Sequence, residues 1–481
     1  MNTVEVEASA LKKSIDGWDR NAVSGFLLKC KESAQRKGCF QVGSIALATQ
    51  LKDPLAILKR MHRDGDPYFY FEHPVTGEAT AGGEALFYQR LEGSDRFAAV
   101  RRFTQSIADK ALVMDEDQLP FSGVRFFCGF SFFDAVRPEV GFPSAAIFVP
   151  RWSVIRRGTD AGIILNVRVE PQSELSVLEN EISTCFQKLS VSEGVEELER
   201  PVERRTEGLK VTEVGDKDGF EMSVQEALNQ IERGYYKKIV LARAVDLENQ
   251  EQSFNAFYSL NHLRKKFLNC FSFALNLGES QSFIGATPES LIQLKGSKME
   301  TSAVAGSAPR GKNEQEDVRL SEALLSSEKN LLEHQVVMES ICGRLQSLGI
   351  EPDVSLRPGL LHLPNVQHLQ SSISAYLPRS IHLMDVVEKL HPTPAVGGTP
   401  RREAQSDIRR LESFDRGLYA GTIGWFDHRG DGEMVVAIRS ALICGQRARI
   451  YAGAGIIKGS DPAQEREETD LKLQAMLEAI F

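Results

Sequence analysis

The chain has 481 residues, 42% of them hydrophobic, and a formal net charge of −9, so it can bury a large core in one or two structural units. Its lysines and arginines are dispersed and form no basic stripe, which argues against a nucleic-acid ligand and favours a small molecule. The N-terminus lacks the basic and apolar regions of a signal peptide, and no run of eighteen apolar residues follows, so we expect neither export nor membrane insertion.

The cysteines show no spacing typical of a zinc knuckle or a disulfide framework. They are Cys30, Cys39, Cys128, Cys185, Cys270, Cys342 and Cys444. This pattern predicts a reducing, cytoplasmic compartment.

The first part of the chain mixes short helices with apolar strands, such as residues 123–133 and 145–150, and has few clustered polar groups. A polar, charged stretch at residues 190–217 is the best candidate for a connection between two halves. We therefore expect residues 1–205 to be the N-terminal, supporting half of the fold and residues 206–481 to be the catalytic region.

After this connection, residues 223–233 predict a helix with Ser223 and Glu226 as a capping box and Gly234 as its end. Residues 238–243 (KIVLAR) follow as a strand buried on both faces. Lys238 would then turn its amine toward packed surroundings, where burial favours the neutral form that can act as a base. The alternative is a lysine at a strand end that extends into water.

A strand is expected at residues 272–277, and another at 283–292 that must break at Pro288 because proline cannot donate within a ladder. Glu289 is presented at that break. Residues 301–311 are mostly small, including Gly306 and Ser307, so backbone amides there could approach an anion closely.

Residues 316–348 predict one long helix with an apolar stripe. Glu333 lies off this stripe on a second, partly covered face, where a carboxylate requires a cation.

The C-terminal region combines residues 451–457 (YAGAGII) with a helix that Asp461, Pro462 and Gln464 introduce as N-cap, first-turn proline and capping-box partner. Glu465, Glu468 and Lys472 fall on roughly one stripe of that helix. Such a face is common on solvated surfaces, but here it follows a glycine-rich strand.

Short segments of the sequence, taken in their order along the chain, resemble the chorismate-utilising enzymes, and among them isochorismate synthases of the menaquinone-pathway type. The matching segments are 238–243 (KIVLAR), 285–289 (GATPE), 305–307 (AGS), 328–334 (EKNLLEH), 366–369 (VQHL), 390–395 (LHPTPA), 416–419 (RGLY), 437–440 (AIRS), 452–456 (AGAGI) and 465–472 (EREETDLK), with looser matches at 128–134 (CGFSFFD) and 148–151 (FVPR).

The resemblance implies an α/β (α+β type) fold, a sandwich of large, mostly antiparallel sheets with helices outside. Periodicity alone supports only a strand-rich α/β protein. The resemblance also implies a magnesium-dependent isomerase that converts chorismate to isochorismate by adding water beside the ring carboxylate while the allylic hydroxyl leaves.

By this resemblance Lys238 is the base that activates water and Glu289 is the acid that protonates the departing hydroxyl. Glu289 must therefore be protonated at the start, which requires a raised pKa. Glu333 and Glu468 match the metal ligands, and such carboxylates with waters and the substrate suit Mg²⁺. Glu465 stands in the adjoining shell.

The remaining matches are expected to bind the substrate. Arg439 and Tyr419 would meet the enolpyruvyl carboxylate, with the amides around Gly453 and Gly455 and with Lys472 completing an anion site. Other matches to the substrate-binding positions are Gly306, Ser307, His368 and Ala395, and His391 is a further motif histidine.

Differences among relatives point to the reaction outcome. Relatives that use ammonia from a glutaminase partner usually lack the lysine found at position 238, so water is favoured as the nucleophile and no glutaminase subunit is expected. Salicylate and anthranilate synthases tend to have threonine where Ala395 stands, which favours stopping at isochorismate. Asn330 stands where many relatives have an acidic residue, so the resemblance does not fix the net charge around the metal.

Three alternatives stay open. The chain could be a salicylate synthase that goes on to expel pyruvate, or an isochorismate synthase of the siderophore type, because the active site does not set the pathway. It could also be a silent relative that binds chorismate-like anions as a regulator, which the complete set of base, acid and ligand positions disfavours.

Overall fold

The computed structural model describes residues 19–50, 53–115, 118–137, 141–190, 198, 208–216, 218–355, 357–363 and 366–480. Most of the predicted connection at 190–217, including the boundary near residue 205, lies outside these residues. Strands from both sides of that boundary pair with each other, as β2 does with β10 and β5 with β18.

Within the described residues, 21 strands join into one continuous network. One series of antiparallel neighbours runs through β8 (Leu209–Glu213), β9 (Lys238–Asn249), β21 (Arg447–Ile457), β20 (Ser440–Cys444), β11 (Gln281–Thr287), β10 (Phe271–Leu277), β2 (Pro67–His73), β3 (Glu78–Leu91) and β6 (Ala145–Arg157). The two-residue β17 (Gly398–Thr399) also pairs with β9.

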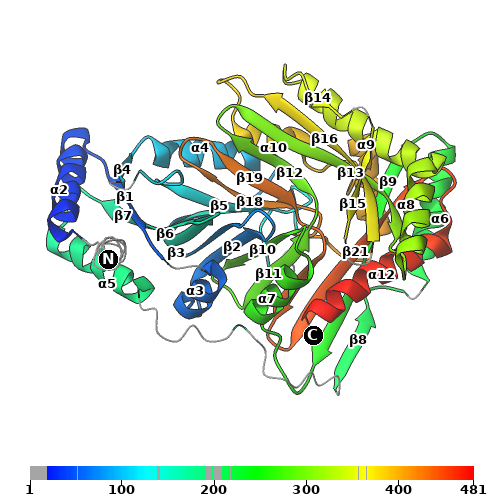
Figure 1. The fold of residues 1–481 in the computed structure, drawn as a ribbon, viewed down its shortest axis with the longest axis horizontal. Helices are drawn as coiled ribbons and strands as arrows, with labels where there is room; N and C mark the ends of the chain where they lie inside the picture. The colour runs from blue at the N-terminus through cyan, green and yellow to red at the C-terminus, as the bar shows by residue number, and fades with distance from the viewer. Residues whose placement is uncertain are drawn as a thin grey trace, which may run out of the picture.

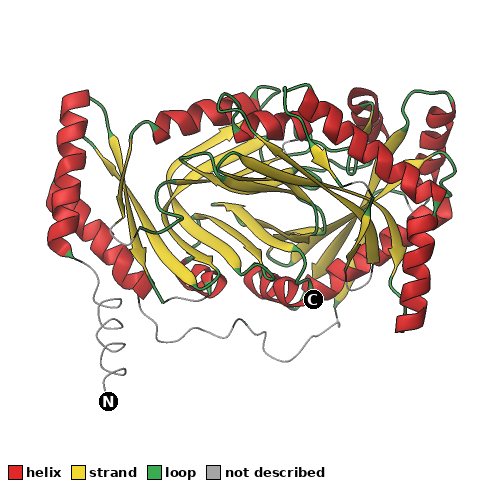
Figure 2. Cartoon of the chain, turned by 45° about the horizontal axis from the view of Figure 1, so that its top comes forward, coloured by secondary structure: helices red, strands yellow, loops and turns green. Residues whose placement is uncertain are grey.

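The network divides at β6. Its second half pairs with β7 (Asp160–Val169), which leads to β1 (Gln41–Ala48) and the parallel strand β4 (Ala111–Asp115). Its first half pairs with β5 (Arg125–Phe130), which leads to β18 (Thr422–Asp427), β19 (Gly432–Val436), β12 (Ser290–Lys295), β13 (Lys298–Pro309), β16 (Val366–Tyr376), β14 (Asp353–Val354) and β15 (Gly359–His362). The sheets face each other with helices around them (Figure 2), which confirms the predicted antiparallel sandwich.

Alternation along the strands explains how two cores form. Phe69 and Phe71 of β2 belong to the larger core cluster, whereas Tyr68 and Tyr70 of the same strand belong to a second cluster. Successive side chains of a strand point to opposite faces. Both faces of β2 are therefore buried, which accounts for the continuous apolar runs in the central strands.

The helices surround the sheets (Figure 1). The helices α3 (Pro54–Met61), α7 (Ala256–Lys266) and α12 (Pro462–Ile480) lie on one side, and α4 (Arg96–Ala108) and α10 (Leu383–Leu390) on the other. At one end lie α2 (Arg20–Lys37) and α5 (Leu175–Ser190), and at the other α6 (Gly219–Glu232), α8 (Glu314–Ser326) and α9 (Glu328–Gln346). The remaining helix is α11 (Arg401–Leu411).

Two helix predictions were wrong. The helix α6 begins at Gly219, so Ser223 lies inside it and its hydroxyl donates to the carbonyl of Leu411 instead of capping. The expected long helix is broken at Ser327, whose extended backbone ends α8 and whose hydroxyl accepts the amide of Asn330 to begin α9. A serine can compete with the helix for backbone bonds in this way.

Two other local predictions were confirmed. The strand 283–292 breaks at Pro288 between β11 and β12, and the carboxylate of Asp461 accepts the amide of Gln464 at the start of α12. All seven cysteines carry free thiols. Among the described helices, none combines the length and hydropathy that crossing a bilayer requires.

A buried ion pair ties the loops around β9 together. Arg416, fully buried, pairs with Glu412 and donates to the carbonyls of Val240 and Val396, each at 2.8 Å. Glu412 in turn accepts the amide of Ala242 at 2.8 Å. One pair thus holds β9 and the loop before β17.

We expect Glu412→Gln to lower the free energy of unfolding by about 3–5 kcal/mol, because it leaves the Arg416 guanidinium buried without a counter-charge. Urea denaturation measures this loss. The control is Glu226→Gln, which removes a partly exposed carboxylate 3.6 Å from Arg410 and should cost little, because ion pairs near the surface contribute little to stability. Equal losses in both variants would contradict the role assigned to the buried pair.

Candidate active site

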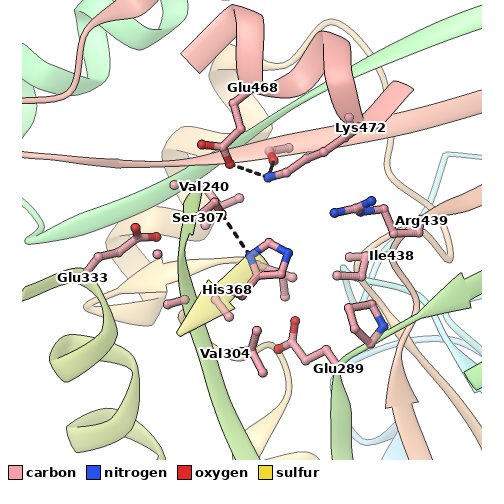
Figure 3. A pocket seen from close by; sticks show the side chains of 18 of the residues that line it. Val240, Glu289, Val304, Ser307, Glu333, His368, Ile438, Arg439, Glu468 and Lys472 are labelled. Carbon is pink, nitrogen blue, oxygen red and sulfur yellow. Dashed lines mark hydrogen bonds and ion pairs between the residues drawn. The ribbon is translucent and has the colours of Figure 1, made fainter. Parts of the chain in front are cut away.

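One cavity collects nearly all the site residues predicted from the sequence, and all of its lining residues come from the region 206–481. The predicted residues that line it are Lys238, Glu289, Gly306, Ser307, Glu333, His368, Ala395, Tyr419, Arg439, Gly453, Gly455, Glu468 and Lys472. Figure 3 shows the carboxylates of Glu333 and Glu468 on one side of it and Arg439 across from them.

Lys238 stands at the first position of β9 and is 1% exposed. Its Nζ lies 2.7 Å from Oε1 of Glu333 on α9. This contact depends on Gly455 of the adjoining strand β21, since a Cβ there would lie 2.5 Å from the same Glu333 oxygen. The prediction that the Glu333 carboxylate requires a cation is thus confirmed, and Lys238 does not extend into water.

Glu289 sits in the turn after Pro288 and is 4% exposed. Burial raises its pKa to about 7, although Lys238 and a hydrogen bond from Thr393 act against the rise. The hydroxyl of Thr393 donates to Oε1 of Glu289 at 3.1 Å. A carboxyl group with this pKa is partly protonated near neutral pH and can donate a proton.

Glu468 and Lys472 face the cavity from α12. Lys472 Nζ lies 2.5 Å from Oε1 of Glu468 and donates to the carbonyl of Gly453 at 2.9 Å. Burial opposes the charged form of Glu468, but the Lys472 ammonium outweighs it and lowers the pKa of this carboxyl. Glu468 is therefore a carboxylate at neutral pH.

Arg439 is the cation best placed to receive an anion. Its side chain is buried against the cavity and has no hydrogen-bond or ion-pair partner among the described residues. Its φ of 49° is unusual for a residue with a side chain, and such backbone strain clusters at binding sites. Tyr419 is buried nearby and stacks on Tyr451 at 4.9 Å between ring centroids.

Ser307 and His368 form the opposite wall. Gly306 has φ of 78° at a bulge in the pairing of β13 with β16, and the next residue, Ser307, places its hydroxyl 3.0 Å from Nδ1 of His368. Burial, with Arg439 and Lys472 nearby, lowers the pKa of His368 to about 3. The imidazole is therefore neutral and suited to orienting a ligand.

Three other predicted residues lie outside the cavity lining. Glu465 is buried beside Glu468 and pairs with Lys329 at 3.1 Å. Asn330 donates to the Ser327 hydroxyl at 2.9 Å and belongs to the start of α9. His391 lies at the end of α10, with Nε2 3.3 Å from the carbonyl of Phe132.

Sequence reasoning missed the role of Thr393, which binds Glu289 from a loop more than one hundred residues away. The sequence did contain a signal for this residue, because Thr393 lies in the segment 390–395 that is part of the resemblance. The aromatic face of Tyr451 was likewise not recognised as part of the cavity.

A metal would have to be held by few protein groups. Within the described residues, no group of three or more His, Cys, Asp or Glu side chains is arranged to hold an ion. Glu333 and Glu468 nevertheless face the same cavity, and Mg²⁺ is commonly held by one or two carboxylates with waters and a substrate anion. The residues present fit such a shared site.

The comparisons with known proteins agree with this geometry. The family described as chorismate binding enzyme matches residues 26–481. The chain is 33% identical to the salicylate biosynthesis isochorismate synthase of Pseudomonas aeruginosa, over 89% of this chain and 88% of that protein. It is 34% identical to isochorismate synthase MenF of Bacillus subtilis, over 83% and 84% of the two chains.

Among solved structures, the menaquinone-specific isochorismate synthase MenF of Escherichia coli superposes with a TM-score of 0.74 at 28% identity. The match covers 95% of this chain and all of that one.

We expect Thr393→Val to raise the pKa of Glu289 by about one unit from its value of about 7, because a donor to the carboxylate favours the charged form. Carboxyl ¹³C NMR titration, with Glu289→Gln to assign the signal, measures the shift. Thr422→Val removes a buried hydroxyl that donates to a backbone carbonyl and should leave the titration unchanged. A lower pKa in Thr393→Val would contradict this account.

Proposed function

Because the chain belongs to the chorismate-binding enzyme family, we propose that it is an isochorismate synthase that converts chorismate to isochorismate. The observation that carries the proposal is the pairing, in one cavity, of a buried amine at Lys238 with a buried carboxyl at Glu289 that is partly protonated at neutral pH. The reaction needs one base and one acid, and the cavity offers one of each.

The reaction replaces one hydroxyl by another across an allylic system. Lys238 acts as the neutral amine, after its proton has left the pair with Glu333, and takes a proton from water, whose oxygen bonds to the ring carbon beside the carboxylate. The double bond shifts, and the bond to the hydroxyl at the other end breaks as Glu289 gives that oxygen its proton. One water enters and one leaves, so the isomerisation consumes no other reactant.

The substrate carboxylates determine its orientation. Arg439, whose guanidinium pairs with no described residue, and the Tyr419 hydroxyl can bind the enolpyruvyl carboxylate, with Lys472 and the backbone near Gly453 completing that wall. The neutral pair Ser307 and His368 can meet the ring hydroxyl without adding charge. Buried donors in fixed positions favour one orientation of a dianion.

We propose that Mg²⁺ is held between Glu333, Glu468 and the ring carboxylate of the substrate. The bound ion would supply positive charge that offsets the ring carboxylate. Glu465 lies beside Glu468 and is itself paired with Lys329. Because the substrate completes the coordination, metal affinity should rise when chorismate is present.

We further propose that residues 1–205 support the catalytic region 206–481, that the enzyme works in the cytoplasm without a glutaminase subunit, and that its product enters menaquinone biosynthesis. The MenF relatives support that pathway, while the salicylate-pathway relative has nearly the same identity. Deleting the gene and measuring menaquinone and salicylate separates the two: loss of menaquinone supports the proposal, and loss of salicylate alone contradicts it.

Incubation of the purified protein with chorismate and magnesium, without ammonia, should yield isochorismate and no pyruvate. Chromatography of the products identifies them. Salicylate with pyruvate would show a salicylate synthase despite Ala395, and unreacted chorismate would indicate a silent relative.

We expect Lys238→Ala to lower kcat by about 10²–10⁴-fold, because it removes the general base, while chorismate binding stays measurable. Steady-state kinetics and calorimetry report the two quantities. The neighbouring Lys237 is exposed, so Lys237→Ala is a matched control that should retain full activity. Unchanged turnover in Lys238→Ala would remove Lys238 as the base.

Glu468→Gln should instead raise the magnesium concentration needed for half-maximal rate by about tenfold or more, because it removes one anionic ligand. The exposed neighbour Glu467 provides the control Glu467→Gln, for which we expect no change. Full activity of Glu468→Gln at ordinary magnesium would discard the ligand assignment.

A further inference from the structure

A second cavity, of about 360 Å³, lies apart from the catalytic one between the starts of α4 and α11 and the end of α10. The two cavities share no lining residue. Four arginines line it, namely Arg96, Arg401, Arg402 and Arg409, against the two carboxylates of Asp134 and Glu388. The cavity is therefore cationic in a chain whose net charge is −9.

The arginines of this cavity are not neutralised by direct contacts. Among the described residues, none of the four forms an ion pair; Arg401 and Arg409 each donate to a backbone carbonyl, of Lys389 and Ala135 respectively. Such hydrogen bonds satisfy single N–H groups of a guanidinium but do not neutralise its positive charge. An anion could bind several of these guanidinium groups at once.

Arg96 is the clearest sign that this cavity favours an anion. Its side chain is 5% exposed, its Nε has no hydrogen-bond partner, and its only described polar contact is a 3.4 Å bond to the carbonyl of Ser131. Burial lowers the pKa of Arg96, and the carboxyls of Asp134 and Glu388 only partly oppose that shift. A buried guanidinium without a counter-charge is costly unless an anion meets it.

The N-termini of two helices add to the positive electrostatic potential of this cavity. Arg96 is the first residue of the thirteen-residue α4 and Arg401 the first of the eleven-residue α11, and neither helix has a side-chain cap. The amides of an uncapped first turn carry partial positive charge. Both helix N-termini and all four arginines therefore favour a negatively charged ligand in the cavity.

We propose that this second cavity binds a small molecule through a multiply charged oxyanion group, either a phosphate or a pair of carboxylates. Phe97, Phe132 and Phe133 line the same cavity and offer apolar surface to the rest of the ligand. The proposal does not depend on the reaction assigned to the catalytic cavity.

One loop connects this cavity to the catalytic cavity. His391 and Pro392 line the second cavity, and Thr393, the next residue, donates to Glu289. The occupant thus contacts the same loop that holds the proposed acid.

Calorimetric titration of the full-length protein at low ionic strength tests the site, with inorganic phosphate as one probe and succinate as the other. The double variant Arg402→Gln/Arg409→Gln removes two exposed arginines of the cavity and should weaken binding by about tenfold or more. The matched control is Arg357→Gln/Arg379→Gln, which removes two exposed arginines elsewhere and alters the net charge equally. Thermal melting checks that both variants fold.

Saturable binding of phosphate that only the first double variant weakens supports a phosphate site, and the same pattern with succinate supports a dicarboxylate site. Binding that is equal in the wild type and both variants would place the anion at Arg439 or elsewhere and overturn the proposal. The absence of saturable binding of either probe below about 10 mM would overturn it as well, since that affinity is weaker than about 3 kcal/mol.

Discussion

The antiparallel pairing of β9 with β21 is the constraint on which the catalytic cavity depends. It places Lys238 opposite Ile457 and brings Gly455, two residues earlier in β21, against the side of the lysine. Because Gly455 has no side chain, α9 can approach closely enough for Glu333 to reach Lys238. The same strand leads directly into α12, which carries Glu468 and Lys472. The proposed base Lys238, the carboxylates of Glu333 and Glu468, and Lys472 are thus positioned by one ladder.

The electrostatics of the catalytic cavity depend on which of its charged side chains form ion pairs. Lys238 and Lys472 are each held by a carboxylate, whereas Arg439 is left without a partner among the described residues. The buried Arg416, by contrast, is fully engaged by Glu412 and by backbone carbonyls. Two buried arginines therefore differ in role: Arg416 fixes the backbone, whereas Arg439 can bind an anion.

The loop after α10 connects the catalytic cavity with the arginine-rich one. His391 and Pro392 line the arginine-rich cavity, while Ala395 and Val396 line the catalytic one. Arg416 holds the carbonyl of Val396, so the loop is anchored close to the catalytic side. In a chain whose net charge is −9, the arginine-rich cavity gathers four arginines against two carboxylates, which suits a small anionic ligand.

The sequence by itself determined the identity of the chemical groups and the local breaks that present them. Lys238 at the start of an apolar strand, Glu289 after Pro288, and the capped helix with Glu468 and Lys472 were all predicted, because strand burial, proline and capping act over a few residues. The break at Ser327 was missed because two adjacent serines, Ser326 and Ser327, give a weak local signal within a long helical pattern.

Only the tertiary structure decided which of these groups meet. Thr393 contacts Glu289, Glu333 contacts Lys238, and Glu465 turns away to Lys329 through contacts between distant segments. The capping box at Ser223 failed for the same reason, since its hydroxyl found a carbonyl in another helix. That Arg96 and Arg439 form no ion pair with any described residue likewise depends on which carboxylates the fold brings near. Local patterns specify residue types and turns, but the distances that set charge and pKa arise from packing.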